Sequence, residues 1–346
     1  MRPARKARKP HEAAEPPGAA ALARLLASRR CVVFTGAGVS ASAGMSAFSD
    51  DNGLYERARK RYKLDSGVRM FYGSFFTNRP RDCQAFLADV YAEACSAAPT
   101  EAHVSLARLQ RLGLVSRHVT LNIDGLHRRC DDGGKTTTEL HGCVRDAVCR
   151  TCGSITPMTP RLAALFRSAA ASNPQCEACP SRGLLRPRVL LYNDPEQHLV
   201  IPGDVEDVIG ADCAAADCVV WAGISFLQSA SVEHFRRVRR AQQHAGSGAP
   251  AVHIIVNPCE EAAFNLTSAV ANADGFTLLT AVCSADEFFT QWARGAEAAL
   301  TTAPPDPGLV AMSESQQAEV QGSLQVTTLS PVAVPEFAAA APPTDT

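Results

Sequence analysis

The sequence contains no long apolar run, no excess of charge of one sign and few aromatic residues. A helix that spans a membrane needs about 20 consecutive apolar residues, and the sequence has no such stretch, so we expect no membrane partner. The 34 Lys and Arg residues balance 35 Asp and Glu residues, which leaves a net charge of −1. This balance does not support a general attraction to nucleic acid or anionic lipid, and we expect no direct sequence-specific nucleic-acid partner.

Cysteine, in contrast, is abundant: the chain has 13. The basic N-terminus is not followed by an apolar segment of secretory type, so export is not expected. An odd number of cysteines without export favours reduced thiols in the nucleus or the cytoplasm. Five Lys or Arg residues among the first nine are typical of a nuclear address or, equally, of a solvated tail.

Four of the cysteines form two C-x2-C pairs separated by 23 residues: Cys149, Cys152, Cys176 and Cys179. Two such turns can enclose a tetrahedral metal ion, so the spacing predicts one structural zinc, with redox-active pairs as the alternative. Because four thiolates fill the coordination shell, this zinc is expected to hold a small module together and to activate no water.

The two ends of the chain differ in composition from its middle. Residues 1–19 are rich in Arg, Lys and Pro, and residues 298–346 are rich in Pro, Ala, Thr, Ser and Gln. Neither segment has enough large apolar side chains to offset the entropy lost on folding. We therefore predict two disordered tails around a folded core at residues 20–297.

Within this core, short apolar runs rich in β-branched residues end abruptly in small or polar residues. They lie at 31–34, 119–121, 218–221, 252–256 and 276–279, and helical patterns lie between them at 22–28, 82–95, 105–112, 232–243 and 285–293. Strands that lack polar alternation suit a parallel sheet covered on both faces. The alternation of strands with helices predicts a Rossmann-like, doubly wound α/β fold.

A doubly wound sheet binds its ligand at the carboxyl ends of the strands, although ordinary turns also occur there. The residues at these ends are Gly36, Gly38, Asn122, Asp124, Ser225, Asn257 and Cys283. The first of these ends continues as a glycine-rich turn, Gly36-Ala-Gly-Val-Ser-Ala-Ser-Ala-Gly44. Glycine lets a backbone approach a phosphate closely, but the spacing differs from the dehydrogenase G-x-G-x-x-G, and no lysine completes a P-loop.

The order of these motifs resembles the sirtuin family. The resemblance runs from Gly36–Gly44 through Phe48, Gly53-Leu-Tyr55, Asn122-Ile-Asp-Gly-Leu-His127, Glu139-Leu-His-Gly142, the cysteine pairs, Leu185-Arg-Pro187, Gly223-Ile-Ser225 and Val256-Asn257. It implies an NAD-dependent protein-lysine deacylase, with protein ADP-ribosylation or non-catalytic binding of NAD and acyl-lysine as alternatives. It also implies a large Rossmann-like part and a small zinc module. The large part is expected at 20–50, 100–142 and 186–297, and the small module at 143–185 with a helical insertion at 51–99.

The resemblance also implies roles for individual residues. Gly36, Ala37, Gly38, Ser40 and Gly44 would form the diphosphate loop of the NAD site, together with Gly223 and Ser225. Asn257 would lie at the adenosine ribose and Cys283 at the adenine, whereas Asn122, Ile123 and Asp124 would line the nicotinamide pocket under Phe48. His141 corresponds to the catalytic base, which suits an imidazole because it accepts a proton near neutral pH. His127 is interpreted as a residue on a helix surface.

In the sirtuin scheme the acyl-lysine carbonyl oxygen attacks the ribose carbon that nicotinamide leaves. The products are free lysine and O-acyl-ADP-ribose. The segment Leu185–Asp194 resembles the part of the family that pairs with an extended acyl-lysine peptide, which would add as a strand near Ser225 and Phe226. Histones are one expected class of substrate.

The chain departs from the family pattern at several positions near the expected NAD site. Ala47 and Ser49 replace an acidic residue and an arginine, Leu121 replaces a glutamine, Ile224 replaces a threonine, and Tyr192-Asn-Asp194 replaces Phe-Gly-Glu. Each lost hydrogen bond costs about 1–3 kcal/mol, although Ser46, Asp50 and Asp51 lie beside the gap and can take over contacts. We therefore expect an active enzyme that is slow or selective.

Overall fold

The structure, a computed structural model, describes residues 18–48, 51–130, 137–168, 173–245, 251–270 and 276–302. The predicted tails therefore lie almost entirely outside the described residues, and so do Ser49 and Asp50. The last helix, α10 (Ala285–Thr302), continues beyond the core boundary expected near residue 297.

The large sheet has the predicted parallel, doubly wound architecture. Its described strands follow the order β3-β2-β1-β7-β8-β9 and all pair in parallel. The strands are β1 (Cys31–Thr35), β2 (Val115–Thr120), β3 (Thr137–Glu139), β7 (Cys218–Ala222), β8 (Ala251–Asn257) and β9 (Phe276–Val282). The chain order reverses between β1 and β7, and a reversal of this kind opens a crevice at the carboxyl ends of the two strands.

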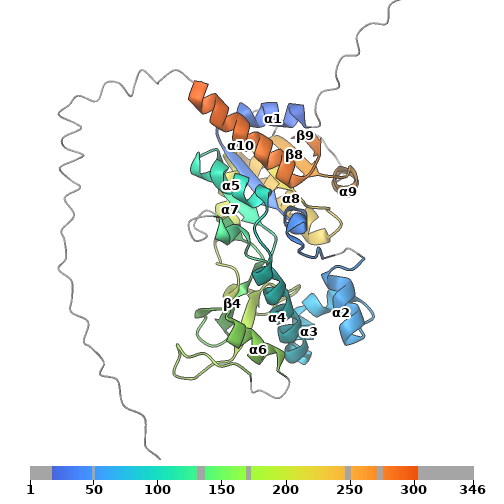
Figure 1. Cartoon of the computed structure of the whole chain (residues 1–346), viewed down its shortest axis with the longest axis vertical. Coiled ribbons are helices and arrows are strands. Elements are labelled where there is room, and N and C mark those ends of the chain that lie inside the picture. Colours follow the sequence, from blue (N-terminus) through green and yellow to red (C-terminus); the bar gives the residue numbers. More distant parts are fainter. Residues whose placement is uncertain are drawn as a thin grey trace, which may run out of the picture. The chain divides into compact units, whose positions relative to one another are not determined.

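Helices cover both faces of this sheet because its strand residues alternate between two cores. Val33, Val220 and Ile254 pack with α1 (Ala19–Leu26), α5 (Glu101–Arg111) and α10 on one face. Neighbouring residues such as Phe34, Trp221 and Ile255 pack on the other face with α7 (Val205–Ala214), α8 (Ser229–Ala245) and α9 (Glu261–Ala269). In Figure 1, α1 and α10 lie together over the strands.

The small module is built on a second sheet with the order β5-β4-β6, which is antiparallel. Its strands are β4 (Gly142–Cys149), β5 (Ile155–Pro157) and β6 (Leu185–Val189). One apolar core joins this sheet to α2 (Leu54–Tyr62), α3 (Gly73–Asn78), α4 (Pro80–Ser96) and α6 (Pro160–Arg167). The helical insertion and the cysteine segment thus belong to one module.

The small module also extends further along the chain than expected. We placed residues from 186 onward in the large part, but β6 pairs with β4 and contributes Leu185 and Val189 to the small core. The sequence of β6 does not look like a strand, because Arg186 and Arg188 interrupt its apolar residues and Pro187 lacks a backbone N–H. Proline is tolerated here because β6 is at the edge of its sheet.

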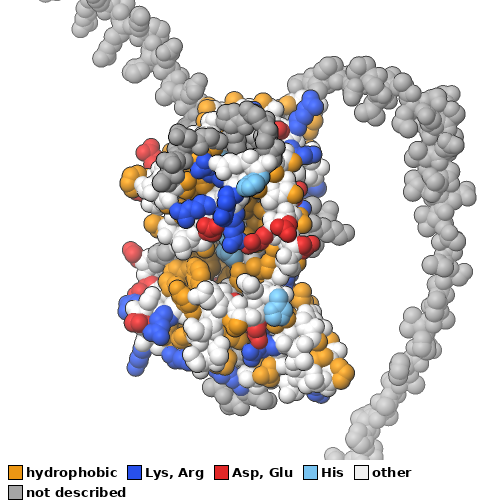
Figure 2. All heavy atoms as spheres, turned by 180° about the vertical axis from the view of Figure 1, so that it is seen from behind, with side chains coloured by type: hydrophobic (Ala, Val, Ile, Leu, Met, Phe, Trp, Pro, Cys, Tyr) orange, Lys and Arg blue, Asp and Glu red, His pale blue; other side chains and the backbone are white. Residues whose placement is uncertain are grey.

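The surface agrees with the near-zero net charge. On the rear face, basic and acidic side chains are interspersed among apolar ones (Figure 2). Short 3-10 helices complete the described elements: η1 (Ala37–Ala43), η2 (Gly67–Phe71), η3 (His127–Arg129) and η4 (Gln197–Leu199). Among the described residues, no helix combines the length and apolarity needed to cross a bilayer.

Candidate active site

The glycine-rich turn after β1 packs directly against the turn after β7. The amide of Gly38 donates a hydrogen bond to the carbonyl of Gly223 at 2.9 Å, and Gly36 bonds in the same way to Ala222 at 3.0 Å. A Cβ on Gly38 would lie 2.7 Å from the Cα of Gly223, which itself has a φ of +64°. The glycines therefore allow the two turns to touch at the point where the strand order reverses.

A buried hydrogen-bond network lies beneath this turn. The hydroxyl of Ser40 donates to Asp124 Oδ2 at 2.8 Å, and Asn122 Nδ2 donates to both Ser40 Oγ at 3.2 Å and the Gly36 carbonyl at 3.1 Å. Asp124 Oδ1 also accepts the amide of Leu126 at 2.9 Å. Ser40 is only 1% exposed, so its contacts are with Asn122 and Asp124 and not with solvent.

Three buried histidines support this network: sequence analysis did not consider His103 and His118, and it misplaced His127. His103 Nε2 lies 3.5 Å from Ser40 Oγ, and its ring is 4.2 Å from that of His127. The Thr35 hydroxyl bonds to His118 at 2.9 Å and to His127 at 3.2 Å. Our placement of His127 on a helix surface is wrong, because the η3 turn points its ring inward to Thr35, where it is 5% exposed.

Burial sets the charge of these histidines. It lowers the pKa of His118 to about 3, lowers that of His127 well below its ordinary value, and also lowers that of His103. All three imidazoles are thus neutral near pH 7 and serve as hydrogen-bonding groups. A sequence signal existed only for His103, which forms a capping box with Thr100 at the start of α5.

His141 follows β3 and faces the same crevice. Its Nδ1 lies 2.9 Å from the carbonyl oxygen of Leu121, which can only accept a hydrogen bond. Nδ1 therefore carries the proton, and the lone pair of a neutral ring is at Nε2. Burial lowers the pKa of His141, and the bond to Leu121 opposes this effect only in part. His141 is consequently a neutral, partly exposed base.

Phe48 lies at the edge of the small core. Its ring centroid is 5.6 Å from those of Tyr55 and Phe71, in tilted and edge-on arrangements. The carbonyl of Phe48 accepts the amide of Tyr55, and that of Ala47 accepts the amide of Leu54. The start of α2 thereby fixes Ala47, which replaces the acidic residue, and Phe48, which follows it. Ile123 is also buried in this core.

The remaining expected residues lie at the ends of neighbouring strands. Asn257, at the end of β8, donates from Nδ2 to the Ile224 carbonyl at 3.3 Å. Ser225 accepts the amide of Leu227 through its hydroxyl, and Cys283 is nearly buried after β9. Gly44 has a φ of +78° and caps η1, and a Cβ at this position would meet no atom within 4 Å. Their roles toward NAD remain predictions.

The four paired cysteines form a cluster that fits zinc. Their sulfur atoms all lie within 4.8 Å of one another, with Cys149 and Cys179 at 3.8 Å and Cys152 and Cys176 at 3.9 Å. A tetrahedral site with zinc–sulfur bonds of about 2.3 Å requires sulfur atoms about 3.8 Å apart. The first of these cysteines ends β4, and among the described residues the cluster has no fifth ligand.

The segment after β6 is held by a buried ion pair. Arg186 donates from Nη2 to Asp194 at 2.7 Å and from Nη1 to Asp194 and Glu196 at 3.0 Å. Burial alone would raise the pKa of Asp194, but the hydrogen bonds from Arg186 hold it below its ordinary value. Asp194 thus forms a rigid anchor although it is shorter than the glutamate of the family pattern.

Comparisons with known proteins agree with the motifs. The model of the Sir2 family matches residues 36–229. Among curated proteins, the chain is 34% identical over 171 residues to an NAD-dependent protein deacylase 2 from Pyrobaculum aerophilum, covering 49% of this chain and 61% of the relative. It is 30% identical over 200 residues to an NAD-dependent protein deacylase 1 from Archaeoglobus fulgidus, covering 57% of this chain and 72% of the relative. The first relatives are thus matched over less than two thirds of their length.

Solved structures match a larger part of the chain. A Sir2 homologue in complex with ADP-ribose aligns with a TM-score of 0.61 and 25% identity, covering 83% of this chain and 99% of the other. A Sir2 protein with a deacetylated p53 peptide and 3′-O-acetyl ADP-ribose aligns with a TM-score of 0.60 and 25% identity, covering 82% and 98%. The likeness extends over both the large sheet and the small module.

Proposed function

Because the chain belongs to the Sir2 family, the sirtuins, we propose that it is an NAD-dependent protein-lysine deacylase with His141 as the base. The observation that carries this proposal is the state of His141: Nδ1 is tied to the Leu121 carbonyl, and Nε2 carries the lone pair. A lowered pKa keeps this ring neutral and able to accept a proton at pH 7.

The residues at the strand ends fit a dinucleotide. Gly36, Gly38 and Gly223 bring the turns after β1 and β7 into contact, and a diphosphate would bind where these turns meet. The amides of these three glycines already pair with backbone carbonyls, so other groups of the two turns would hold the phosphates. When bound, NAD supplies a ribose carbon from which nicotinamide can leave. The buried network of Ser40, Asn122 and Asp124 fixes the floor of the nicotinamide pocket, and Phe48 excludes water from above.

The departures from the family pattern weaken this site less than their number implies. Leu121 cannot donate a side-chain hydrogen bond to a ribose, but its backbone carbonyl still orients His141. Asp194 retains a buried pair with Arg186. The missing acidic side chain at Ala47 has no comparable replacement among the described residues, so we propose that turnover is slow and not absent.

An acyl-lysine peptide would bind beside the segment Leu190–Asp194. The amide and carbonyl of Tyr192 already pair with Phe71 and Gly73, at 2.7 and 2.8 Å. A peptide that adds as a strand must therefore use backbone groups that Tyr192 does not provide, such as the carbonyl of Leu191. Histones remain one proposed class of substrate, and a nuclear or cytoplasmic location remains a proposal as well.

The test is mass spectrometry of the products formed from NAD and an acetyl-lysine peptide. We expect deacetylated peptide and O-acetyl-ADP-ribose, and a loss of about 10²–10⁴-fold in rate for His141→Ala. His198→Ala, which changes an exposed histidine outside the crevice, is the matched control. Nicotinamide release with the acetyl group retained would instead establish ADP-ribosylation or NAD hydrolysis, and bound NAD without any product would establish a binding module.

A further inference from the structure

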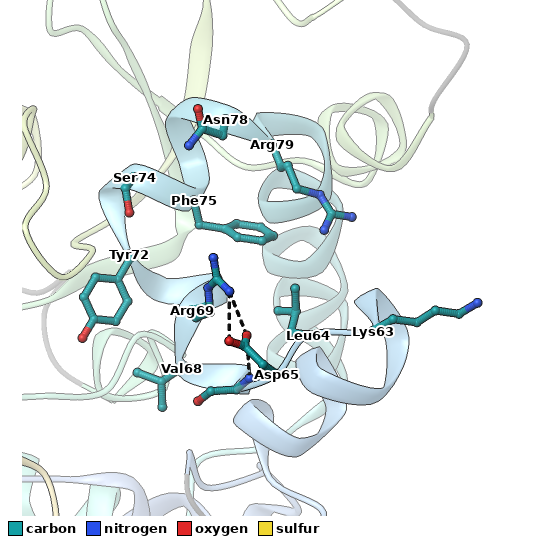
Figure 3. A pocket seen from close by; sticks show the side chains of 11 residues that line it. Lys63, Leu64, Asp65, Val68, Arg69, Tyr72, Ser74, Phe75, Asn78 and Arg79 are labelled. Atoms are coloured by element: carbon teal, nitrogen blue, oxygen red, sulfur yellow. Dashed lines mark hydrogen bonds and ion pairs between the residues drawn. The ribbon is translucent and has the colours of Figure 1, made fainter.

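The helical insertion contains a hollow that none of the expected sirtuin roles uses. Its volume is about 860 Å³, and it lies between the end of α2, η2 and α3 (Figure 3). Phe75 forms its floor, with Tyr72 at one side and Arg69 and Arg79 at the rim. Figure 3 shows Arg69 reaching into the hollow toward Phe75, whereas Lys63 extends outward from the edge.

The hollow is cationic although the whole chain is nearly neutral. Its lining includes Lys63, Arg69 and Arg79 but a single acidic residue, Asp65. The neighbouring Arg57 and Arg61 pair with Glu93 and Asp89, so the positive excess at the hollow comes from its own lining residues. A local excess of this kind attracts carboxylates, most strongly at low ionic strength.

The two arginines keep hydrogen-bond donors for a ligand. Arg69 uses one nitrogen, Nη1, for both of its bonds to Asp65, at 2.9 and 3.0 Å. Arg79 pairs with Asp82 through Nη2, and its guanidinium lies 5.2 Å from the centre of the Phe75 ring. An arginine presents five N–H groups in a fork that matches a carboxylate, so each retains donors after its own ion pair.

The hollow is continuous with the segment at which we place the substrate. Tyr72, which lines it, pairs as an isolated parallel bridge with Tyr192, and the two rings lie 5.4 Å apart. Hydrogen bonds from Tyr192 to Phe71 and from Gly73 to Tyr192 hold the two backbones together. A peptide paired with Leu191 lies across this segment from Tyr72, so the residues that flank its paired part are the ones that can reach the rim of the hollow.

We propose that this hollow selects protein substrates in which acidic side chains flank the acyl-lysine. The inference rests on the deacylase function proposed above and deepens it, because it assigns a sequence preference to the same peptide. Among the histones proposed above, this preference disfavours the lysine-rich segments of the tails. A folded protein segment fits better than nucleic acid, since the two arginines flank an apolar floor beside the acyl-lysine site and do not form a continuous basic track.

The test compares peptides that share one acetyl-lysine core. The residues that flank it on both sides are acidic (Asp and Glu) in the first peptide, serine in the second and basic (Lys and Arg) in the third. For each peptide, kcat/KM is measured with NAD at low and at high salt. We expect the acidic peptides to have a KM about fivefold lower than the serine peptides at equal kcat, with the difference shrinking at high salt. Fluorescence anisotropy of the same peptides measures binding without catalysis.

Charge-reversed variants locate the effect. Arg69→Glu/Arg79→Glu is expected to abolish the acidic preference while leaving kcat for the serine peptide unchanged. The control, Arg59→Glu/Arg240→Glu, makes the same change of net charge at exposed arginines that also form ion pairs but do not line the hollow. We expect this control to retain most of the preference.

The outcomes separate this inference from the function on which it rests. Deacylation without an acidic preference, or an equal loss in both double variants, would overturn the inference and leave the deacylase standing. Acidic peptides bound through Arg69 and Arg79 without deacylation would support the hollow and refute the enzyme. Binding of duplex DNA, lost in the Arg69 and Arg79 variant while peptide preference is unaffected, would also overturn the inference.

Discussion

The large sheet and the small module keep their functional residues in place by different means. In the large sheet, hydrogen bonds join Ser40 to Asn122, Asp124 and His103, and glycine turns touch backbone to backbone. In the small module, the fixed points are charged: a cluster of four thiols and the buried pair of Arg186 with Asp194. A further charged group joins Arg128 and Glu139 of the large part to Asp146 in β4 of the small module.

The difference follows from the amount of core that each region can bury. Six parallel strands covered on both faces supply a large apolar core, so the crevice needs only polar groups that orient one another. The small module has one apolar core, which its sheet of three short strands shares with four helices, and small modules commonly rely also on a metal ion and on strong ion pairs. The small module should therefore be the part that fails first when a charge or a metal is removed.

Removal of zinc is the largest change we expect. Structural zinc contributes about 10–16 kcal/mol of apparent binding free energy in zinc-finger peptides, so Cys149→Ser should lose the metal and unfold the small module. Hydrogen exchange should show lost protection in β4 and β6 but retained protection in β1, β7 and β8. Metal analysis should give one zinc per chain for the unchanged protein and for Cys95→Ser, a matched variant at an exposed cysteine outside the cluster. Retained protection in β4 without metal would contradict the assigned role of zinc.

A smaller effect is expected when the buried ion pair is broken. Arg186 is 1% exposed, and Arg186→Met leaves the Asp194 carboxylate buried without its partner. The expected loss is about 3–5 kcal/mol of unfolding free energy, measured by denaturant titration. Arg150→Met removes an exposed partner of the neighbouring Glu196 and should cost at most about 1 kcal/mol. Equal losses for the two variants would show that burial does not strengthen the pair.

The same contrast explains what the sequence could predict. The strands of the large sheet were readable because Val32–Phe34 and Val219–Trp221 are continuous apolar runs, which only a strand buried on both faces requires. The cysteine pairs were readable because a metal site imposes a fixed local spacing. Both signals lie within a few consecutive residues, so no knowledge of the fold was needed.

What the sequence concealed depends on residues that meet only after folding. Thr35 bonds to His118, 83 residues away, and to His127, 92 residues away, and neither bond has a local pattern. A lone histidine after a turn resembles a surface residue until the sheet brings Thr35 beside it, which is why His127 was misplaced. The end of the small module was concealed for a similar reason, since β6 becomes a strand only by pairing with β4.

The smallest effect we expect is a change in how the free energy of unfolding depends on pH, and it comes from the buried histidines of the large sheet. Their pKa values are lowered by burial, to about 3 for His118, so the unfolded chain binds more protons than the folded one below about pH 6.5. Stability should be fully present above that pH and should fall as the pH decreases, by about 1.4 kcal/mol per unit for each histidine kept neutral. The stabilisation that ionised Asp194 provides is present throughout this pH range. It is lost only at lower pH, because the pKa of Asp194 in the folded state lies below its ordinary value.

His118→Gln tests this assignment because glutamine can keep a hydrogen bond to Thr35 without taking up a proton. The slope of unfolding free energy between pH 6 and pH 4.5 should decrease by about one proton, measured by urea titration at each pH. His198→Gln, at an exposed histidine, should leave the slope unchanged. An unchanged slope for His118→Gln would mean that His118 takes up protons in the folded state. The three buried histidines would then not be the sealed, neutral group that distinguishes the large sheet from the small module.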